Sequence, residues 1–240
     1  MALIDIRDLT FAYPGSYDNV FEHLSLQLDT HWRLGLVGRN GRGKTTLLRL
    51  LQRQYEYDGA ISVPVPLDCF PSPVSAPERD TLTILEEQEP GLELWRIYKE
   101  LDMLEVDAGV LFRPYSSLSG GEQVKVLLAA LFLREGAFLL LDEPTNHLDY
   151  GNQLRALSMV RALVKRGFGV IMTSHNPDHV LLLGGQVGIL GNDGRFLVGN
   201  AEEVMTEERL RALYRSDLYL TYVERVGRKV CIPGRLKSDE

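Results

Sequence analysis

The chain has 240 residues, enough for one large domain or two small ones, and 45% of them are hydrophobic, as in globular proteins with a sizeable core. Its formal net charge of −7 argues against nucleic acid as the main partner, because nucleic-acid binding normally needs a basic face. No apolar run approaches the ~20 residues needed to span a bilayer, and charges stand near the N-terminus where a signal peptide has an apolar core, so we expect a cytoplasmic protein.

Two alternating stretches open the chain. Apolar and polar residues alternate over residues 2–13 and again over residues 20–28, with Pro14 and Gly15 between them, and this pattern predicts two strands. Tyr13 ends the first strand. Its ring is either an ordinary aromatic at a sheet edge or a flat surface on which a nucleotide base stacks, and the residues alone leave both interpretations open.

A glycine-rich loop comes next. Residues 34–51 read LGLVGRNGRGKTTLLRLL, in which a short buried strand precedes the loop and an amphipathic helix follows it. Gly38, Gly43, Lys44 and Thr45 match the phosphate-binding pattern G-x-x-x-x-G-K-[ST]. Glycines let backbone N–H groups turn toward a polyanion, Lys44 can reach its β- and γ-phosphates, and Thr45 can offer a hydroxyl to Mg²⁺. The sequence therefore predicts nucleotide binding at this loop.

The middle of the chain combines prolines with a helical pattern. Residues 59–65 look like a strand, and the prolines around and after them exclude helix and central strand, which favours a linker or a hinge between subdomains. These prolines are Pro64, Pro66, Pro71, Pro73 and Pro77. Apolar residues spaced among glutamates and lysines then predict helix over residues 81–111.

A second glycine pair opens a later helix, which we expect to run to about Arg134. Ser119 is followed three residues later by Glu122, a pairing typical of a capping box at a helix start. A cap does not explain Gly120 and Gly121, which weaken the first turn of a helix. Glycines there leave backbone N–H groups bare, and the pattern favours a second helix end that faces phosphate.

Two buried strands end in residues that could carry chemistry. Residues 137–141 form a continuous apolar run followed by Asp142 and Glu143, at the strand end where doubly wound sheets bind ligands. Asp142 is placed to hold Mg²⁺, and Glu143 to orient and deprotonate an attacking water. Residues 168–174 predict another strand, and His175 at its end is either structural or catalytic.

The remaining sequence shows no pattern that suggests chemistry. Residues 187–198 predict a hairpin around Asn192, Asp193 and Gly194, residues 202–214 a helix, and residues 218–232 a second hairpin. Cys69 and Cys231 are too few and too isolated for a disulfide framework or a metal site, so we expect free thiols.

These motifs in this order resemble the nucleotide-binding domain of an ABC ATPase, over nearly the whole chain. Residues 38–46 (GRNGRGKTT) are similar to Walker A, 118–123 (LSGGEQ) to the signature, and 138–144 (FLLLDEP) to Walker B. Residues 146–149 (NHLD) and 173–175 (TSH) are similar to the D-loop and the switch histidine. The signature is nearly diagnostic for this family.

The resemblance implies a role for each matching residue. Nucleotide contacts then include Tyr13 on the adenine and the loop residues Gly38, Arg39, Asn40, Gly41, Gly43, Lys44, Thr45 and Thr46. Glu143 becomes the catalytic base and His175 the sensor of the γ-phosphate, while Thr45 and Asp142 bind Mg²⁺. Ser119, Gly120 and Gly121 would contact the ATP held by a second copy of the domain.

The resemblance also implies a fold. We expect an α/β P-loop NTPase with a RecA-like core sheet, an antiparallel β subdomain and an inserted helical subdomain. Residues 1–240 would form a single ATP-binding domain, with the helical subdomain at about 78–136 and a C-terminal extension of hairpins and helix at about 186–240.

The sequence departs from the family pattern at one hinge, and its two halves resemble different subfamilies. Members usually carry a glutamine at the hinge into the helical subdomain, where it contacts Mg²⁺ and water, and Ser72 stands at that place. The chain through about residue 149 resembles ABC-F resistance proteins that act on the ribosome, which have two such domains and a long arm not seen here. From about residue 150 it resembles ATPase subunits of iron-siderophore and cobalamin-type importers.

We therefore expect an ATPase that uses ATP and Mg²⁺ and works as a head-to-tail homodimer. Its partner would be an integral-membrane permease, with metal-chelate import as one use, and its location the inner face of the plasma membrane. No direct nucleic-acid partner is favoured. The alternatives are an ABC-F-like ATPase on the ribosome and a hybrid or designed ABC domain.

Overall fold

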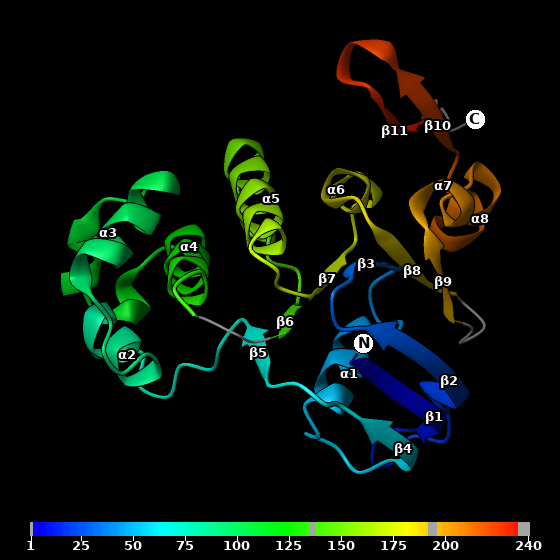
Figure 1. The fold of residues 1–240 in the computed structure, drawn as a ribbon, viewed down its shortest axis with the longest axis horizontal. Helices are drawn as coiled ribbons and strands as arrows, with labels where there is room; N and C mark the ends of the chain where they lie inside the picture. The colour runs from blue at the N-terminus through cyan, green and yellow to red at the C-terminus, as the bar shows by residue number, and fades with distance from the viewer. Residues whose placement is uncertain (1, 135–137, 192–195, 235–240) are drawn as a thin grey trace, which may run out of the picture. The chain divides into compact units, whose positions relative to one another are not determined.

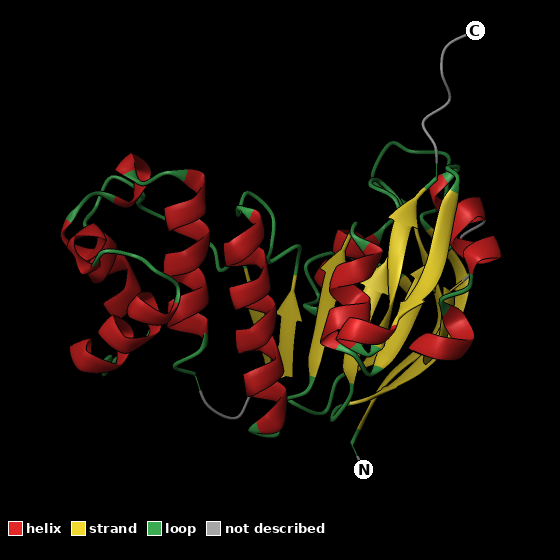
Figure 2. Ribbon diagram, turned by 90° about the horizontal axis from the view of Figure 1, so that it is seen from above, coloured by secondary structure: helices red, strands yellow, loops and turns green. Residues whose placement is uncertain are grey.

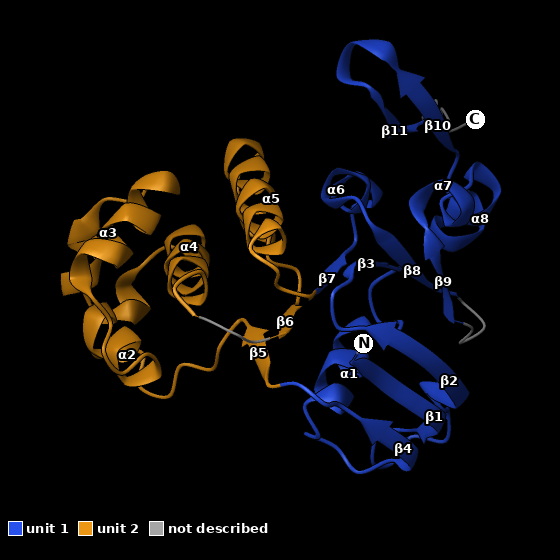
Figure 3. Ribbon diagram, in the orientation of Figure 1, with its two compact units in different colours: residues 1–65, 170–240 blue, residues 66–169 orange. Residues whose placement is uncertain are grey.

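The computed structural model describes residues 2–134, 138–191 and 196–234, and the chain divides into two compact units (Figure 3). Unit 1 consists of residues 1–65 and 170–240, and unit 2 of residues 66–169. Apart from β5 and β6, the labelled strands belong to unit 1, whereas unit 2 is mainly helical (Figures 1 and 2).

Unit 1 contains a three-stranded antiparallel sheet in the order β2-β1-β4. Its strands are β1 (Leu3–Phe11), β2 (Phe21–Asp29) and β4 (Asp58–Ser62). Ile4 pairs with Leu28, and both side chains are buried because the alternation along each strand places apolar residues on one face. The three strands predicted near residues 2–13, 20–28 and 59–65 are confirmed, with ends shifted by one to three residues.

Unit 1 also holds a run of strands in the order β7-β3-β8-β9. They are β3 (Arg33–Val37), β7 (Val170–Ser174), β8 (Gln186–Leu190) and β9 (Phe196–Asn200). β3 is parallel to β7 and β8, and these strands are almost wholly buried, as apolar runs covered on both faces are. Two short helices belong to this part, α1 (Lys44–Leu51) directly after the glycine-rich loop and α6 (Pro177–Leu183) after β7.

The C-terminal elements pack into the core of unit 1. They are α7 (Ala201–Val204), α8 (Glu207–Tyr214), β10 (Leu218–Val223) and β11 (Arg228–Pro233). Val204, Leu210 and Leu213 share one buried cluster with Val37 of β3 and Val187 of β8. The hairpin over residues 218–232 is confirmed, and the strands flanking the first hairpin pair as expected, while its turn residues 192–194 lie outside the described residues.

The helix predicted over residues 202–214 is interrupted. α7 ends at Val204 and α8 begins at Glu207, with Thr206 between them as the N-cap of α8. The Thr206 hydroxyl accepts a hydrogen bond from the backbone N–H of Arg209 at 3.3 Å. Threonine competes for backbone groups in this way, so it starts a new helix instead of continuing the old one.

The described residues of unit 2 form one parallel strand pair and four α-helices. The strands are β5 (Leu67–Phe70) and β6 (Phe138–Leu141), and the helices are α2 (Thr81–Gln88), α3 (Leu94–Met103), α4 (Gly120–Leu131) and α5 (Tyr150–Lys165). Short 3-10 turns cover Ala108–Phe112 and Tyr115–Ser117. Among the residues described here and in unit 1, no helix has both the length and the apolar character that crossing a bilayer requires.

Two sequence predictions in unit 2 need correction. The proline-rich stretch is not only a linker, because β5 fits between Pro66 and Pro71 and pairs in register with β6. β5 stands at the end of its strand order, where a flanking proline costs no ladder hydrogen bond. The helix predicted over residues 81–111 is broken at Pro90, because proline cannot continue a helix and its predecessor Glu89 has an extended φ of −129°.

Candidate functional site

The glycine-rich loop in unit 1 forms a tight turn onto the start of α1. Gly43 is the N-cap of α1 with φ +94°, and a Cβ there would lie 2.7 Å from Cγ1 of Val20. Only glycine accommodates that conformation and that crowding. The first N–H groups of α1 therefore point out of a cap that has no side chain, which is the arrangement that binds anions at helix N-termini.

Lys44 lies over this loop. Its side chain is only 5% exposed, and Nζ donates hydrogen bonds to the carbonyl oxygens of Gly38 at 2.7 Å and Arg39 at 3.1 Å. The backbone of the loop thus holds the Lys44 ammonium group in place. A buried cation beside a row of backbone N–H groups favours a polyphosphate ligand.

Tyr13 stands next to the loop helix. Its hydroxyl is 2.7 Å from the Thr46 hydroxyl, in the first turn of α1, and the ring remains 39% exposed. Phe11 and Tyr55 meet the ring in edge-to-face contacts, with centroids 5.1 and 5.6 Å away. The fold therefore brings this tyrosine to the phosphate loop, and its contact with adenine stays a prediction.

His175 lies at the same edge of the sheet as the loop. Ser174, the last residue of β7, pairs with Val37, the last residue of β3, so His175 and Gly38 leave parallel strands side by side. The His175 carbonyl accepts a hydrogen bond from the Tyr214 hydroxyl at 2.8 Å. The sequence did not indicate that α8 supports this histidine, because the contact joins residues that are far apart in the chain.

A second histidine, His179 of α6, is buried near His175. Burial, and then the nearby His175, lower the pKa of His179 below its usual value of 6.5. The lowered pKa favours the neutral form of His179, which avoids placing a positive charge in the apolar core beside Val180. Sequence reasoning missed this residue because a lone histidine in a short helix carries no local signal.

The acidic pair lies in unit 2, at the end of β6. The backbone N–H of Asp142 donates to the carbonyl oxygen of Phe70 at 2.8 Å, which continues the pairing of β6 with β5. Glu143 has φ +46°, an uncommon conformation for a residue with a side chain. Such strain is concentrated at functional sites, and here it sets the direction in which the half-buried Glu143 leaves the strand.

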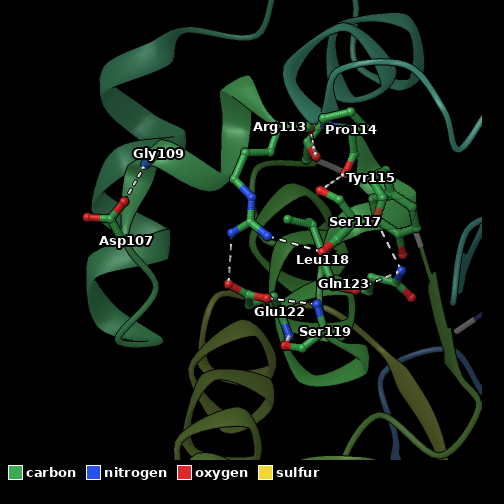
Figure 4. Close-up of polar contacts among 11 residues, drawn as sticks. Asp107, Gly109, Arg113, Pro114, Tyr115, Ser117, Leu118, Ser119, Glu122 and Gln123 are labelled. Atoms are coloured by element: carbon green, nitrogen blue, oxygen red, sulfur yellow. Dashed lines mark hydrogen bonds and ion pairs between the residues drawn. The ribbon is translucent and has the colours of Figure 1, made fainter.

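The signature residues begin α4 in the same unit. The Ser119 hydroxyl accepts from the Glu122 backbone N–H at 3.3 Å, and the Glu122 carboxylate accepts from the Ser119 N–H at 2.7 Å. This confirms the capping box, and the Ser119 N–H bond lowers the pKa of the Glu122 carboxyl. Arg113 braces the box, contacting Glu122 at 3.5 Å and the Ser117 carbonyl at 3.1 Å (Figure 4).

The two signature glycines have no role that this chain explains. A Cβ on Gly120 would lie 3.9 Å from Cβ of His147, and one on Gly121 would lie 3.5 Å from the His147 carbonyl oxygen. Both are ordinary van der Waals distances, so an alanine would fit. The contact also reveals that the turn after Glu143 reaches the start of α4, which the sequence could not indicate.

Thr45 and Asp142 provide oxygen atoms of the kind that Mg²⁺ prefers, a hydroxyl and a carboxylate. Within the described ranges, no three His, Cys, Asp or Glu side chains cluster into a ligand set. A magnesium ion held by either residue would complete its shell with water and with the oxygens of a bound phosphate, as is usual for this ion. Each donor therefore suits Mg²⁺ bound together with a nucleotide.

Comparison with known proteins identifies the family. A family model described as "ABC transporter" matches residues 21–146, more than half of the chain. The hemin import ATP-binding protein HmuV of a Chelativorans species is 28% identical, over 90% of this chain and 92% of that protein. ABC transporter F family member 3 of Arabidopsis thaliana is 31% identical, over 80% of this chain but only 27% of its own length.

A solved structure has the same fold over nearly its full length. It is described as an inward-facing conformation of a metal-chelate type ABC transporter, and its chain is 26% identical to this one. The superposition has a TM-score of 0.76 and covers 98% of this chain and 97% of that chain. The predicted α/β P-loop fold is confirmed by this similarity.

Proposed function

The chain belongs to the ABC transporter family as an ATP-binding subunit, and we propose that it hydrolyses ATP with Mg²⁺ in a head-to-tail dimer that drives a membrane permease. ATP-binding domains of this family are ATPases in general. The observation that carries the proposal is the buried Lys44 ammonium over a glycine-capped helix start, because this geometry suits the β- and γ-phosphates.

The residues of the two units have complementary roles in this mechanism. In unit 1, Lys44 and the loop N–H groups hold the phosphates, and His175 leaves the adjacent strand where the γ-phosphate would lie. Thr45, also in unit 1, would offer its hydroxyl to Mg²⁺. In unit 2, Glu143 would accept a proton from the attacking water, and Asp142 would offer a carboxylate oxygen to Mg²⁺. The ion, when bound, would neutralise charge on the phosphate oxygens.

The paired arrangement rests on the signature glycines. Gly120 and Gly121 make helix α4 less stable than alanines would. The described neighbours of both positions leave room for a Cβ, so packing within the chain does not require glycine there. Bare N–H groups at this helix start suit a phosphate from a second copy, next to the Ser119 hydroxyl. Two copies facing each other would then enclose two ATP molecules, each between one loop and one signature.

The relatives support a proposal for the partner and the cargo. HmuV matches this chain at nearly full length and is named for hemin import, and the solved neighbour is of metal-chelate type. We therefore propose a permease for a metal chelate as the partner, with the ATPase at the cytoplasmic face of the membrane. The 31% sequence identity to an ABC transporter F family member supports a ribosome-associated ATPase as the second candidate.

Hydrolysis and partner capture test the proposal. Phosphate release by the purified full chain should require Mg²⁺ and stop on addition of a chelator. Tagged chain should co-purify a multi-span protein from detergent-solubilised membranes of its source and should not sediment with ribosomes in sucrose gradients. Sedimentation with ribosomes without a membrane partner would replace the first candidate by the second, and absence of ATP binding would overturn both.

A further inference from the structure

The loop after β5 leaves the strand pair beside the acidic residues. Phe70, the last residue of β5, pairs in register with Leu141, and its carbonyl oxygen accepts the backbone N–H of Asp142 at 2.8 Å. Residues 71–73 therefore start next to Asp142, one residue before Glu143. The loop is thus one residue removed from the backbone hydrogen bond that joins the ends of β5 and β6.

A glutamine from α2 holds this loop. The Ser72 hydroxyl donates to Oε1 of Gln88 at 2.9 Å, and Nε2 of Gln88 donates to the Pro73 carbonyl oxygen at 3.1 Å. Two bonds from one amide clamp two neighbouring residues of the loop. They use one of the two N–H bonds of the amide and one of the two lone pairs of its oxygen, so the group keeps capacity for another partner.

The helix that carries Gln88 is itself anchored at both ends. At its start, the Thr81 backbone N–H and hydroxyl both donate to the Arg113 carbonyl oxygen at 2.9 Å. At its end, Glu89 forms an ion pair with Arg134, which also pairs with Asp68 of β5 at 3.0 Å. Contacts at both ends of α2 therefore fix the position from which Gln88 reaches the loop.

The far end of α2 connects to the signature. The carbonyl oxygen of Arg113 accepts the two bonds from Thr81, and its guanidinium lies 3.5 Å from the Glu122 carboxylate, which accepts the Ser119 N–H. One short helix in unit 2 thus spans from the loop beside Asp142 to the residues that support Ser119. Each step of this connection is a direct hydrogen bond or ion pair between described residues.

We propose that Gln88 is a positioning residue for ATP hydrolysis: by clamping Ser72 and Pro73 it holds the loop that directly follows Phe70, whose carbonyl oxygen accepts the Asp142 N–H. This inference rests on the proposed ATPase function and adds to it a residue that lies outside the family motifs. Family members usually carry a glutamine where this chain has Ser72, and here Gln88 brings a side-chain amide to that hinge from α2. Its removal should affect the chemical step more than nucleotide binding, because the phosphate loop belongs to unit 1.

Steady-state ATPase kinetics of the full chain test this role. Gln88→Ala should lower kcat by roughly 10-fold to 100-fold, as misplaced reacting groups do, while KM for ATP changes by less than about twofold. Ser72→Ala should lower kcat similarly, and the double variant should lose no more than either single one, because both act through one contact. Gln88→Glu keeps the acceptor for Ser72 and loses the donor to Pro73, so its kcat should lie between.

Two further measurements separate positioning from general damage. Glu86→Ala, on the exposed side of α2, is the matched control and should leave kcat unchanged. Hydrogen exchange of a peptide covering residues 70–76 should become faster in Gln88→Ala while the peptide over α4 stays protected. If Gln88→Ala melts below the assay temperature, the kcat of Gln88→Glu decides the question.

The outcomes distinguish the two proposals. A wild-type chain that hydrolyses ATP no faster than Glu143→Gln removes the ATPase function and this inference with it. An active wild type with a fully active Gln88→Ala, or with losses that multiply in the double variant, overturns only the role of Gln88. A loss in kcat that is shared by Ser72→Ala and not increased in the double variant supports it.

Discussion

Two helices of this protein have glycine at their N-terminal ends, α1 at its N-cap and α4 in its first turn, and the fold requires only one of these glycines. At the start of α1, Gly43 has φ +94° and a Cβ would lie 2.7 Å from a Val20 methyl group. At the start of α4, a Cβ on Gly121 would meet nothing closer than 3.5 Å. The loop glycine is thus required by the fold itself, whereas the signature glycine is not.

The caps of the two helices differ in the same sense. Gly43 caps α1 without a side chain, so a ligand can reach the first N–H groups directly. α4 has a capping box, which satisfies part of its N-terminus within the chain. This difference is what we expect if, as proposed, the start of α1 binds a nucleotide within one copy and the start of α4 contacts the nucleotide of a second copy. Four experiments test this difference, in order of expected effect.

A variant that binds ATP without hydrolysing it should hold the start of α1 in one copy against the start of α4 in a second copy. Glu143→Gln keeps the shape of the side chain but cannot accept a proton, so turnover should fall by about 10²–10⁴-fold while ATP still binds. With ATP intact, the variant should form an ATP-dependent dimer, measured by light scattering. Adding Ser119→Arg should abolish the dimer without affecting ATP binding to the loop. Wild-type turnover would exclude Glu143 as the base, and a monomer at saturating ATP would exclude the shared site.

Removing the positive charge of Lys44 should weaken phosphate binding at the start of α1 and leave the start of α4 unchanged. Lys44→Ala should weaken ATP binding by ~1.5–3 kcal/mol, the usual worth of hydrogen bonds to a charged group. Affinity by calorimetry and a thermal melt should be measured on the same sample. Lys165→Ala, an exposed lysine in the last turn of α5, is the control for the charge change. Equal affinity of both variants would show that Lys44 does not contact the phosphates.

Alanine at each glycine tests the comparison directly. Gly43→Ala should cost ~1–3 kcal/mol of the free energy of unfolding, because it imposes backbone strain as well as a clash with Val20. Gly121→Ala should raise that free energy by up to ~1 kcal/mol, since alanine is the better helix residue and its Cβ fits. Urea unfolding measures both. If the two substitutions destabilised equally, the signature glycine would be structural after all.

The smallest effect concerns the cap of the second helix. The pKa of Glu122 is lowered because its carboxylate accepts the Ser119 N–H, so its stabilisation is complete above its usual pKa and lost as pH falls through the lowered value. Glu122→Ala should cost only ~0.5 kcal/mol at pH 7, since the Glu122 side chain is partly exposed and screened by solvent. The difference in unfolding free energy from wild type should shrink on acidification, and a constant difference would contradict the cap.

Local patterns were enough to predict much of this protein from its sequence. The alternation over residues 2–13, the G-x-x-x-x-G-K-[ST] spacing and the Ser119–Glu122 cap involve neighbours within a few positions, and the structure has the strand, the loop and the capping box there. The prediction failed where a local rule had a non-local exception. Prolines argued against a strand at residues 67–70, but pairing with β6 needs only four residues and leaves both prolines outside.

Only the tertiary structure could decide which distant residues support the site. Tyr13 meets Thr46, Tyr214 holds the carbonyl of His175, and Gln88 clamps Ser72, and each of these contacts joins residues at least 16 positions apart. A sequence pattern reports spacing along the chain, whereas these side chains are brought together by strand register and helix packing. The sequence therefore determined which chemical groups the protein carries, and the fold determined what holds them in place, because hydrogen bonds depend on distance in space and not on order in the chain.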